Sequence, residues 1–141
     1  MFIYNNGGRL KSGSAGDCVA RAIAIASEKN YQEVWEYLAE KTETQRSSKR
    51  TKKRGRTADK GINVKRKWFQ EYMESLGFNW VTCMGIGTGC KVHLRAEELP
   101  KGRLICSVSK HYVAVIDGVI NDTHDPSRNG TRCVYGYWIK N

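Results

Sequence analysis

The sequence lacks the features that mark membrane, secreted or disulfide-rich proteins. Its apolar runs fall far short of the ~20 residues that cross a bilayer. Its first residues show no basic region followed by an apolar one, so we expect no secretory signal. It holds five cysteines, an odd number, and no CxxC pair. We therefore expect the cysteines to be reduced and the protein to be cytoplasmic.

The composition is that of one globular domain. The chain has 141 residues, 40% of them hydrophobic, and no internal repeat. A chain of this length buries about two-thirds of its unfolded surface, which is enough for a real core. We expect a single domain over residues 1–141 with no membrane association and no bound metal or cofactor.

The positive charge is concentrated in one segment. Residues 46–67 hold eleven Lys or Arg and a single acid, while the rest of the chain carries thirteen bases and thirteen acids. Residues 46–63 contain few apolar side chains, so we expect a mobile basic loop there. It is either a solubilising insertion or an arm that binds nucleic acid nonspecifically through its phosphates. The candidate contacts are Lys49, Arg50, Lys52, Lys53, Arg54 and Arg56.

Three helices are predicted in the first half of the chain. The segment from residue 18 is apolar almost all round, which favours a central, buried helix with Asp17 at its start. Asn30 and Glu33 form a capping box for a second helix. A third amphipathic helix has Val64, Trp68, Tyr72 and Leu76 on its apolar face, with Phe69 and Met73 beside them, and ends at Gly77.

The second half has the pattern of strands. The expected strands are residues 78–83, 90–94, 103–109, 111–116, 119–123 and 133–139. Helices followed by antiparallel strands are typical of the α+β class, here with N-terminal helices packed on a C-terminal antiparallel sheet. The N-terminal residues, rich in glycine, are expected to form a loop.

Cys18 is the candidate nucleophile. It lies in the first turn of the central helix, where free N–H groups and the helix dipole stabilise a thiolate. The alternative is a small residue that packs at a helix start. His111 favours the catalytic interpretation, because a thiol is a weak nucleophile until an imidazole activates it.

A hairpin places His111 beside an acid. Asp117 and Gly118 separate two apolar runs, which predicts a two-residue type I′ turn and therefore a fixed register. In that register Asp122 is the diagonal neighbour of His111 on one face of the sheet. A carboxylate there orients the imidazole and stabilises its charged form. His124 shares the face and is an alternative base.

The chain resembles the papain-like cysteine peptidase superfamily. The resemblance rests on a cysteine that opens the first long helix and on a later strand-borne histidine followed by an acid. The segments GSAGDCVARAIAIA and HYVAVIDGVINDTHDPS look like those of bacteriocin-processing peptidase domains. The whole chain is also similar to uncharacterised bacteriophage and prophage proteins. The resemblance implies a papain-like fold, a Cys18–His111–Asp122 triad and, if the chain is phage-encoded, a location in the host cytoplasm.

One departure from that superfamily concerns the oxyanion hole. The glutamine that usually precedes the cysteine is missing, and Asn6, Ser12 and Ser14 are the candidate donors beside the Cys18 N–H. We expect a cysteine hydrolase acting on a peptide, isopeptide or amide bond, with a peptide or protein as substrate. The alternative is an inactive papain-like scaffold that binds nucleic acid or a host factor.

Two further patterns are weaker. Cys83, Cys90 and His93 have metal-ligand chemistry, but a C-x6-C-x2-H spacing matches no common zinc site, so buried strand cysteines are favoured. The glycines of residues 85–89 suggest a phosphate loop but lack its Lys-Ser/Thr continuation. A role in shaping a loop is the preferred interpretation, with the wall of a substrate groove as one option for that loop.

Overall fold

A computed structural model describes residues 2–8, 17–44, 62, 64–85 and 87–140. The candidate oxyanion donors Ser12 and Ser14 lie outside the described residues. So do the candidate nucleic-acid contacts Lys49, Arg50, Lys52, Lys53, Arg54 and Arg56 and almost all of the predicted basic loop. No described helix combines the length and apolar character needed to cross a membrane.

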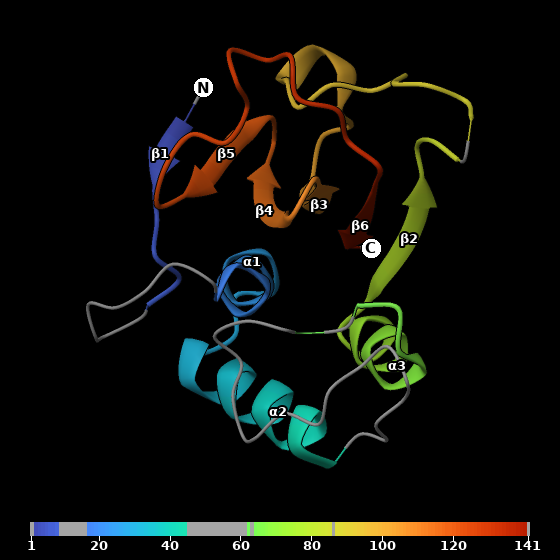
Figure 1. Cartoon of the computed structure of the whole chain (residues 1–141). Coiled ribbons are helices and arrows are strands. Elements are labelled where there is room, and N and C mark those ends of the chain that lie inside the picture. Colours follow the sequence, from blue (N-terminus) through green and yellow to red (C-terminus); the bar gives the residue numbers. More distant parts are fainter. Residues whose placement is uncertain (1, 9–16, 45–61, 63, 86, 141) are drawn as a thin grey trace.

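The described residues form an α+β fold with three α-helices and a six-stranded mixed sheet (Figure 1). The strands lie in the order β1-β5-β4-β3-β6-β2. All neighbouring strands are antiparallel except β1 and β5, which are parallel. Their bounds are β1 Phe2–Tyr4, β2 Phe78–Thr82, β3 Arg103–Val108, β4 His111–Ile116, β5 Val119–Asp122 and β6 Gly136–Lys140.

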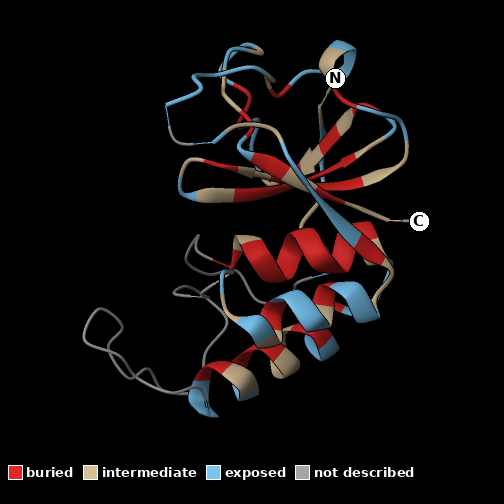
Figure 2. Cartoon of the chain, turned by 90° about the vertical axis from the view of Figure 1, so that its right-hand side faces the viewer, coloured by how far each residue is buried: buried red, intermediate tan, exposed pale blue. Residues whose placement is uncertain are grey.

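The helices cover one face of this sheet. Helix α1 (Cys18–Ser27) lies between the sheet and α2 (Tyr31–Thr44), and it is buried along most of its length (Figure 2). Helix α3 (Lys67–Ser75) packs below β2 (Figure 1). Asn30 caps α2 as expected, because its Oδ1 accepts hydrogen bonds from the N–H groups of Gln32 and Glu33. The prediction of a central, buried α1 is confirmed.

The hairpin between β4 and β5 has the predicted register. Asp117 and Gly118 both have positive φ, at 49° and 82°, as a type I′ turn requires. Ile116 pairs with Val119 across the turn. The start of β4 and the end of β5 therefore meet at one end of the sheet, beside the N-terminus of α1.

The other face of the sheet carries a second core under two long connections. Leu94, Leu99 and Val134, from the segments before β3 and before β6, pack with Leu104 and Val115 of the sheet. The first connection contains a short 3-10 helix, Ala96–Glu98. These connections complete a layered structure with the sheet in the middle (Figure 1).

Several sequence-based expectations need correction. The N-terminal segment forms β1, so the sheet is mixed and not purely antiparallel. Residues 90–94 make only an isolated bridge, from His93 to Cys133, and no strand. Helix α3 begins at Lys67, after Val64, and its fully buried residues are Phe69 and Met73, whereas Trp68, Tyr72 and Leu76 are half-buried.

The cysteines also differ from the expectation. Cys90 and Cys133 form a disulfide with their Cα atoms 5.7 Å apart. Cys18, Cys83 and Cys106 are free. The expectation that all five are reduced was wrong because two connections far apart in the sequence lie side by side on the same face of the sheet.

Candidate active site

Cys18 opens α1 at the end of the sheet where β4 begins. It is half-buried, and its thiol takes part in a hydrogen bond with the His111 side chain and another with the backbone of Tyr112. The first four N–H groups of a helix have no partner within it, and the Cys18 amide is one of these groups. The predicted meeting of Cys18 with His111 is therefore present.

Asp122 holds the other side of the His111 ring. His111 Nε2 lies 2.6 Å from Asp122 Oδ2, and Asp122 is 3% exposed. Because Nε2 is engaged with the carboxylate, Nδ1 is the ring atom left to exchange a proton with Cys18. The hairpin register brings these two side chains together, as the sequence predicted.

The electrostatics of the site favour a thiolate–imidazolium pair. Burial opposes ionisation of Cys18, but the hydrogen bonds from His111 and Tyr112 and the positive charges of His111 and Arg21 outweigh it and lower the pKa of the thiol. Burial likewise disfavours the charged imidazole, but the contacts with Asp122 and Cys18 raise the pKa of His111 to about 9. A lowered thiol pKa beside a raised imidazole pKa favours transfer of the thiol proton to His111.

A network of buried charged groups contacts Asp122 and so supports the Cys18–His111 pair. Arg21 donates from Nη1 to Asp17 Oδ1 at 2.9 Å, and its Nη2 lies 3.5 Å from Asp122 Oδ1. Tyr31 of α2 donates its hydroxyl to Asp17 Oδ2 at 2.7 Å. Because all these groups are buried, each charge needs its partner, and the network fixes α1 against both the sheet and α2.

Asp17 lies at the start of α1, where the sequence suggests a helix cap or a first-turn acid. It stands at the N-cap position of α1, but its side chain makes no capping hydrogen bond and is used by Arg21 and Tyr31 instead. Sequence reasoning missed Arg21 and Tyr31. Arg21 did carry a signal, because a single charged side chain on an otherwise apolar, buried helix must have a buried partner.

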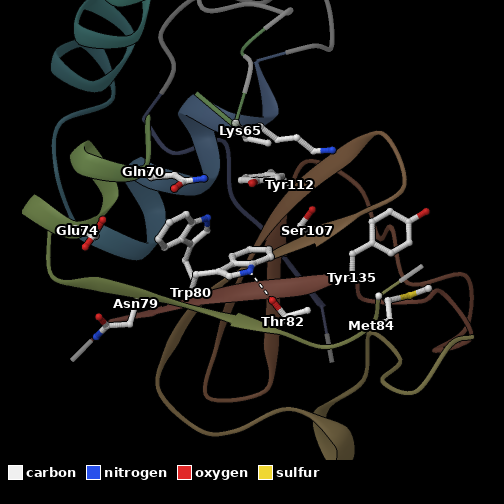
Figure 3. A pocket seen from close by; sticks show the side chains of 13 residues that line it. Lys65, Gln70, Glu74, Asn79, Trp80, Thr82, Met84, Ser107, Tyr112 and Tyr135 are labelled. Carbon is white, nitrogen blue, oxygen red and sulfur yellow. Dashed lines mark hydrogen bonds between the residues drawn. The ribbon is translucent and has the colours of Figure 1, made fainter. Parts of the chain in front are cut away.

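A cavity of about 750 Å³ lies on the helix-covered side of β3, β6 and β2, next to α3. Tyr112, which follows His111, lines one part of it, and Trp80 and Trp138 pack against each other in its wall with ring centres 5.3 Å apart. Figure 3 shows Gln70 and Glu74 of α3 at one side and Met84 and Tyr135 at the opposite side. Tyr112 is common to the cavity and the site, because it lines the cavity and its backbone bonds the Cys18 thiol.

The structure also places two other features that were expected near the site, the glycine-rich loop and Asn6. Gly85, from the glycine-rich loop, lines the cavity, as the groove-wall interpretation predicted. Asn6 lies in the turn after β1, where its Oδ1 accepts a hydrogen bond from the Gly8 N–H at 3.0 Å. Its role as an oxyanion donor stays a prediction.

Two clusters in the described part of the chain have the chemistry to hold a metal ion. One is His111, Asp122 and His124, which belongs to the site itself; the His124 ring centre lies 5.3 Å from that of His111. The other is Cys90, His93 and Cys133, in the two connections that cover the sheet face away from the helices. Cys83 is in neither cluster. The preferred interpretation of Cys83 and Cys90 as buried strand cysteines was wrong, because Cys90 is exposed, Cys83 is half-buried and both lie outside the strands.

Comparison of the chain with protein-family models, curated proteins and solved structures finds no significant match. The arguments on function therefore rest on the geometry of this chain.

Proposed function

We propose that the protein is a cysteine hydrolase of papain-like type that acts on a peptide, isopeptide or amide bond. The observation that carries the proposal is the hydrogen-bonded series Cys18, His111 and Asp122, with the thiol at a helix N-terminus. Each position matches a chemical requirement: an ionised nucleophile, a base that becomes an acid, and a carboxylate that orients the base.

The reaction follows from the protonation states of the pair. The Cys18 thiolate attacks the carbonyl carbon, while the oxyanion faces the Cys18 N–H and the free amides of the first turn of α1. The His111 imidazolium gives its proton to the leaving amine as the C–N bond breaks, which leaves a thioester on Cys18. Neutral His111 then takes a proton from water. The resulting hydroxide attacks the thioester, the C–S bond breaks, and the thiolate and imidazolium return.

The aromatic cavity is the proposed substrate groove. It is lined by four aromatic rings, Trp80, Tyr112, Tyr135 and Trp138, and has polar groups at its edges, including Lys65 and Glu74. Such a lining suits one bulky apolar side chain of a peptide whose backbone continues toward the polar rim. Because Tyr112 borders both the groove and Cys18, a residue held in the groove would place a neighbouring peptide bond at the thiol.

The test is acyl transfer from an activated ester such as p-nitrophenyl acetate. The purified chain should form a thioester on Cys18, visible by intact and peptide mass spectrometry and removable by hydroxylamine, and should release p-nitrophenol over repeated turnovers. Cys18→Ala should abolish both signals. His111→Ala should reduce the rate by about 10²–10⁴-fold, as expected for loss of a general acid–base.

Cys83 provides the matched control, because it is also a free, half-buried thiol but burial raises its pKa. Cys83→Ala should leave acylation unchanged. Equal acylation of Cys18 and Cys83, or turnover that survives Cys18→Ala, would overturn the proposal.

We propose, second, that the basic segment attracts nucleic acid, independently of the hydrolase site. The support is the charge distribution, since residues 46–67 contain the entire net charge of +10. Binding should be insensitive to sequence and should weaken steeply with salt. Neutralising the cluster Lys49, Arg50, Lys52, Lys53, Arg54 and Arg56 with Gln should abolish the electrophoretic shift of DNA and RNA. A shift that persists in that variant, or none with the parent at low salt, would exclude this role.

A further inference from the structure

Two segments that are distant in the sequence meet at Cys90, His93 and Cys133. Cys90 and His93 belong to the connection after β2, and Cys133 belongs to the connection before β6. His93 and Cys133 form an antiparallel backbone bridge, which fixes their relative positions. The two sulfurs and one imidazole nitrogen lie within 4.8 Å of one another. This cluster is separate from Cys18 and plays no part in the proposed hydrolysis.

Glu98 orients the His93 ring within this cluster. Its Oε1 lies 3.1 Å from His93 Nδ1 and also accepts the His93 backbone N–H at 3.1 Å. Arg95 forms an ion pair with the same carboxylate. With Nδ1 engaged, the other nitrogen, Nε2, points to Cys90 Sγ at 3.5 Å. A histidine that donates one N–H to a carboxylate and presents the other nitrogen to thiols has the arrangement typical of metal-ligating histidines.

We propose that Cys90, His93 and Cys133 bind a zinc ion when both cysteines are thiols. Thiolate and imidazole are the ligands that zinc prefers, and tetrahedral geometry places them about 3.5–4 Å apart. The 3.5 Å separation of Cys90 Sγ and His93 Nε2 already fits one edge of such a tetrahedron. Cys90 is exposed, so the fourth position is open to water or another donor from solvent.

The disulfide and the zinc ion exclude each other on chemical grounds. Zinc needs two thiolates, whereas the disulfide has used both sulfurs in the S–S bond. A dithiol reductant supplies two electrons and two protons and converts the disulfide to two thiols, becoming a disulfide itself. Zinc binding then releases those two protons to solvent.

The zinc site would fasten the wall of the aromatic cavity from the opposite side of the sheet. Tyr135, two residues after Cys133, lines the cavity, and its carbonyl accepts the N–H of Cys83 at 2.9 Å. Val134 donates its N–H to the Val92 carbonyl at 2.8 Å. Joining the two connections at Cys90 and Cys133 holds these contacts in place, so the role of the metal is structural.

The test is a metal titration of the full chain in a Cys18→Ser background, which removes the other reactive thiol. The protein is reduced with dithiothreitol, desalted without oxygen and titrated with Co²⁺ and then Zn²⁺. We expect one equivalent of Co²⁺ to give a thiolate-to-cobalt charge-transfer band that Zn²⁺ abolishes. Glu98→Gln should weaken binding about 10–100-fold, and His93→Gln should weaken it further.

His93→Gln separates a metal site from a purely covalent link, because it removes a ligand and leaves both cysteines able to form the disulfide. His124→Gln is the matched control, since His124 belongs to the other cluster, and it should bind as the parent does. No cobalt band in the reduced parent, or equal affinity in the parent and His93→Gln, would overturn the proposal. Failure of ester turnover would not affect it.

Discussion

Asp122 is the residue on which the charge state of the site depends most. Its Oδ2 lies 2.6 Å from His111 Nε2. Its Oδ1 accepts the Thr123 N–H and lies 3.5 Å from Nη2 of Arg21 in α1. Burial opposes its ionisation, but the hydrogen bond and charge of His111, with help from Thr123 and Arg21, lower the pKa of this carboxyl. The acid therefore stays charged where His111 needs a counterion.

Replacing Asp122 by Asn should change both the rate and its pH dependence. Without the carboxylate, the pKa of His111 falls from about 9 toward its ordinary value. His111 must be protonated to release the leaving group, so the alkaline limb of the pH–rate profile of an amide substrate should move to lower pH. The maximal rate should fall by about 10²–10⁴-fold. Steady-state rates from pH 5 to 10 measure both effects.

The control for this change is Asp117→Asn, at the other end of the same hairpin. Asp117 has a positive φ that Asn tolerates, and an amide oxygen can still accept the Gly102 N–H. This variant should keep the parental profile. An alkaline limb that stays in place in Asp122→Asn would show that Asp122 does not control His111.

Among the individual site residues, the sequence predicted the pair His111 and Asp122, because both lie on one hairpin. The Asp117–Gly118 turn fixes the register of β4 and β5, and a fixed register decides that His111 meets Asp122. The role of Arg21 could not be predicted in the same way. Its partner Asp122 lies on another element, and local patterns do not specify distances between elements.

Helix α1 is fastened at its C-terminal end as well as at Cys18. Arg103, at the start of β3, donates from Nε to the Ala26 carbonyl at 2.7 Å and from Nη2 to the Ile25 carbonyl at 2.9 Å. These are carbonyls of the last turn, which have no partner within the helix. The positive charge also interacts favourably with the negative end of the helix dipole.

Arg103→Met should therefore destabilise the fold by about 1–3 kcal/mol, because it leaves two partly buried carbonyls without a donor. Urea denaturation followed by tryptophan fluorescence measures the free energy of unfolding. Lys101→Met, an exposed change of the same kind two residues earlier, should change it little. Equal stability of the two variants would contradict the proposed capping by Arg103.

Strand β6 depends on a glycine for its contact with β2. A Cβ at Gly136 would lie 2.3 Å from the Trp80 ring and 2.8 Å from the Val81 carbonyl. Gly136→Ala should displace Trp80, separate it from Trp138 and cost about 1–3 kcal/mol. Unfolding curves and the tryptophan emission spectrum report the two effects.

Gly85→Ala is the control for that substitution. Gly85 also lines the cavity, but a Cβ there would meet only the Thr88 methyl group, at 3.8 Å. Its stability should match the parent. If Gly136→Ala were as stable as Gly85→Ala with an unchanged spectrum, the packing of Trp80 over Gly136 would be wrong.

Element prediction was most successful where a segment has a strong local pattern. Helices α1 and α2 and the β4–β5 hairpin follow from apolar periodicity, a capping Asn30 and a turn dipeptide. Strand β1 could not be predicted from such a pattern, because Phe2–Tyr4 is only three residues long. Its partner, β5, lies more than one hundred residues away in the sequence. A parallel pairing of that kind leaves no periodic trace in the sequence.

For the whole molecule, the sequence predicted the α+β class but not which connections pack against each other. The segments before β3 and before β6 cover the sheet face opposite the helices, and the Cys90–Cys133 link joins them across 43 residues. Neither segment has regular periodicity, so nothing local indicated their contact. The layered arrangement has a consequence for function, since Cys18 opens a helix on one side of the sheet, whereas Cys90 and Cys133 lie in connections on the other side.

The central claim is that His111 activates Cys18 as an ion pair. It is tested most directly by the pH dependence of Cys18 alkylation with iodoacetamide, quantified by peptide mass spectrometry in the parent and in His111→Ala. Because the pKa of Cys18 is lowered, the parent should react with a midpoint below the ordinary thiol value of about 8.5. In His111→Ala burial remains and the imidazolium is gone, so the midpoint should rise above that value. Identical titration of Cys18 in the two proteins, at the ordinary thiol pKa, would contradict the account.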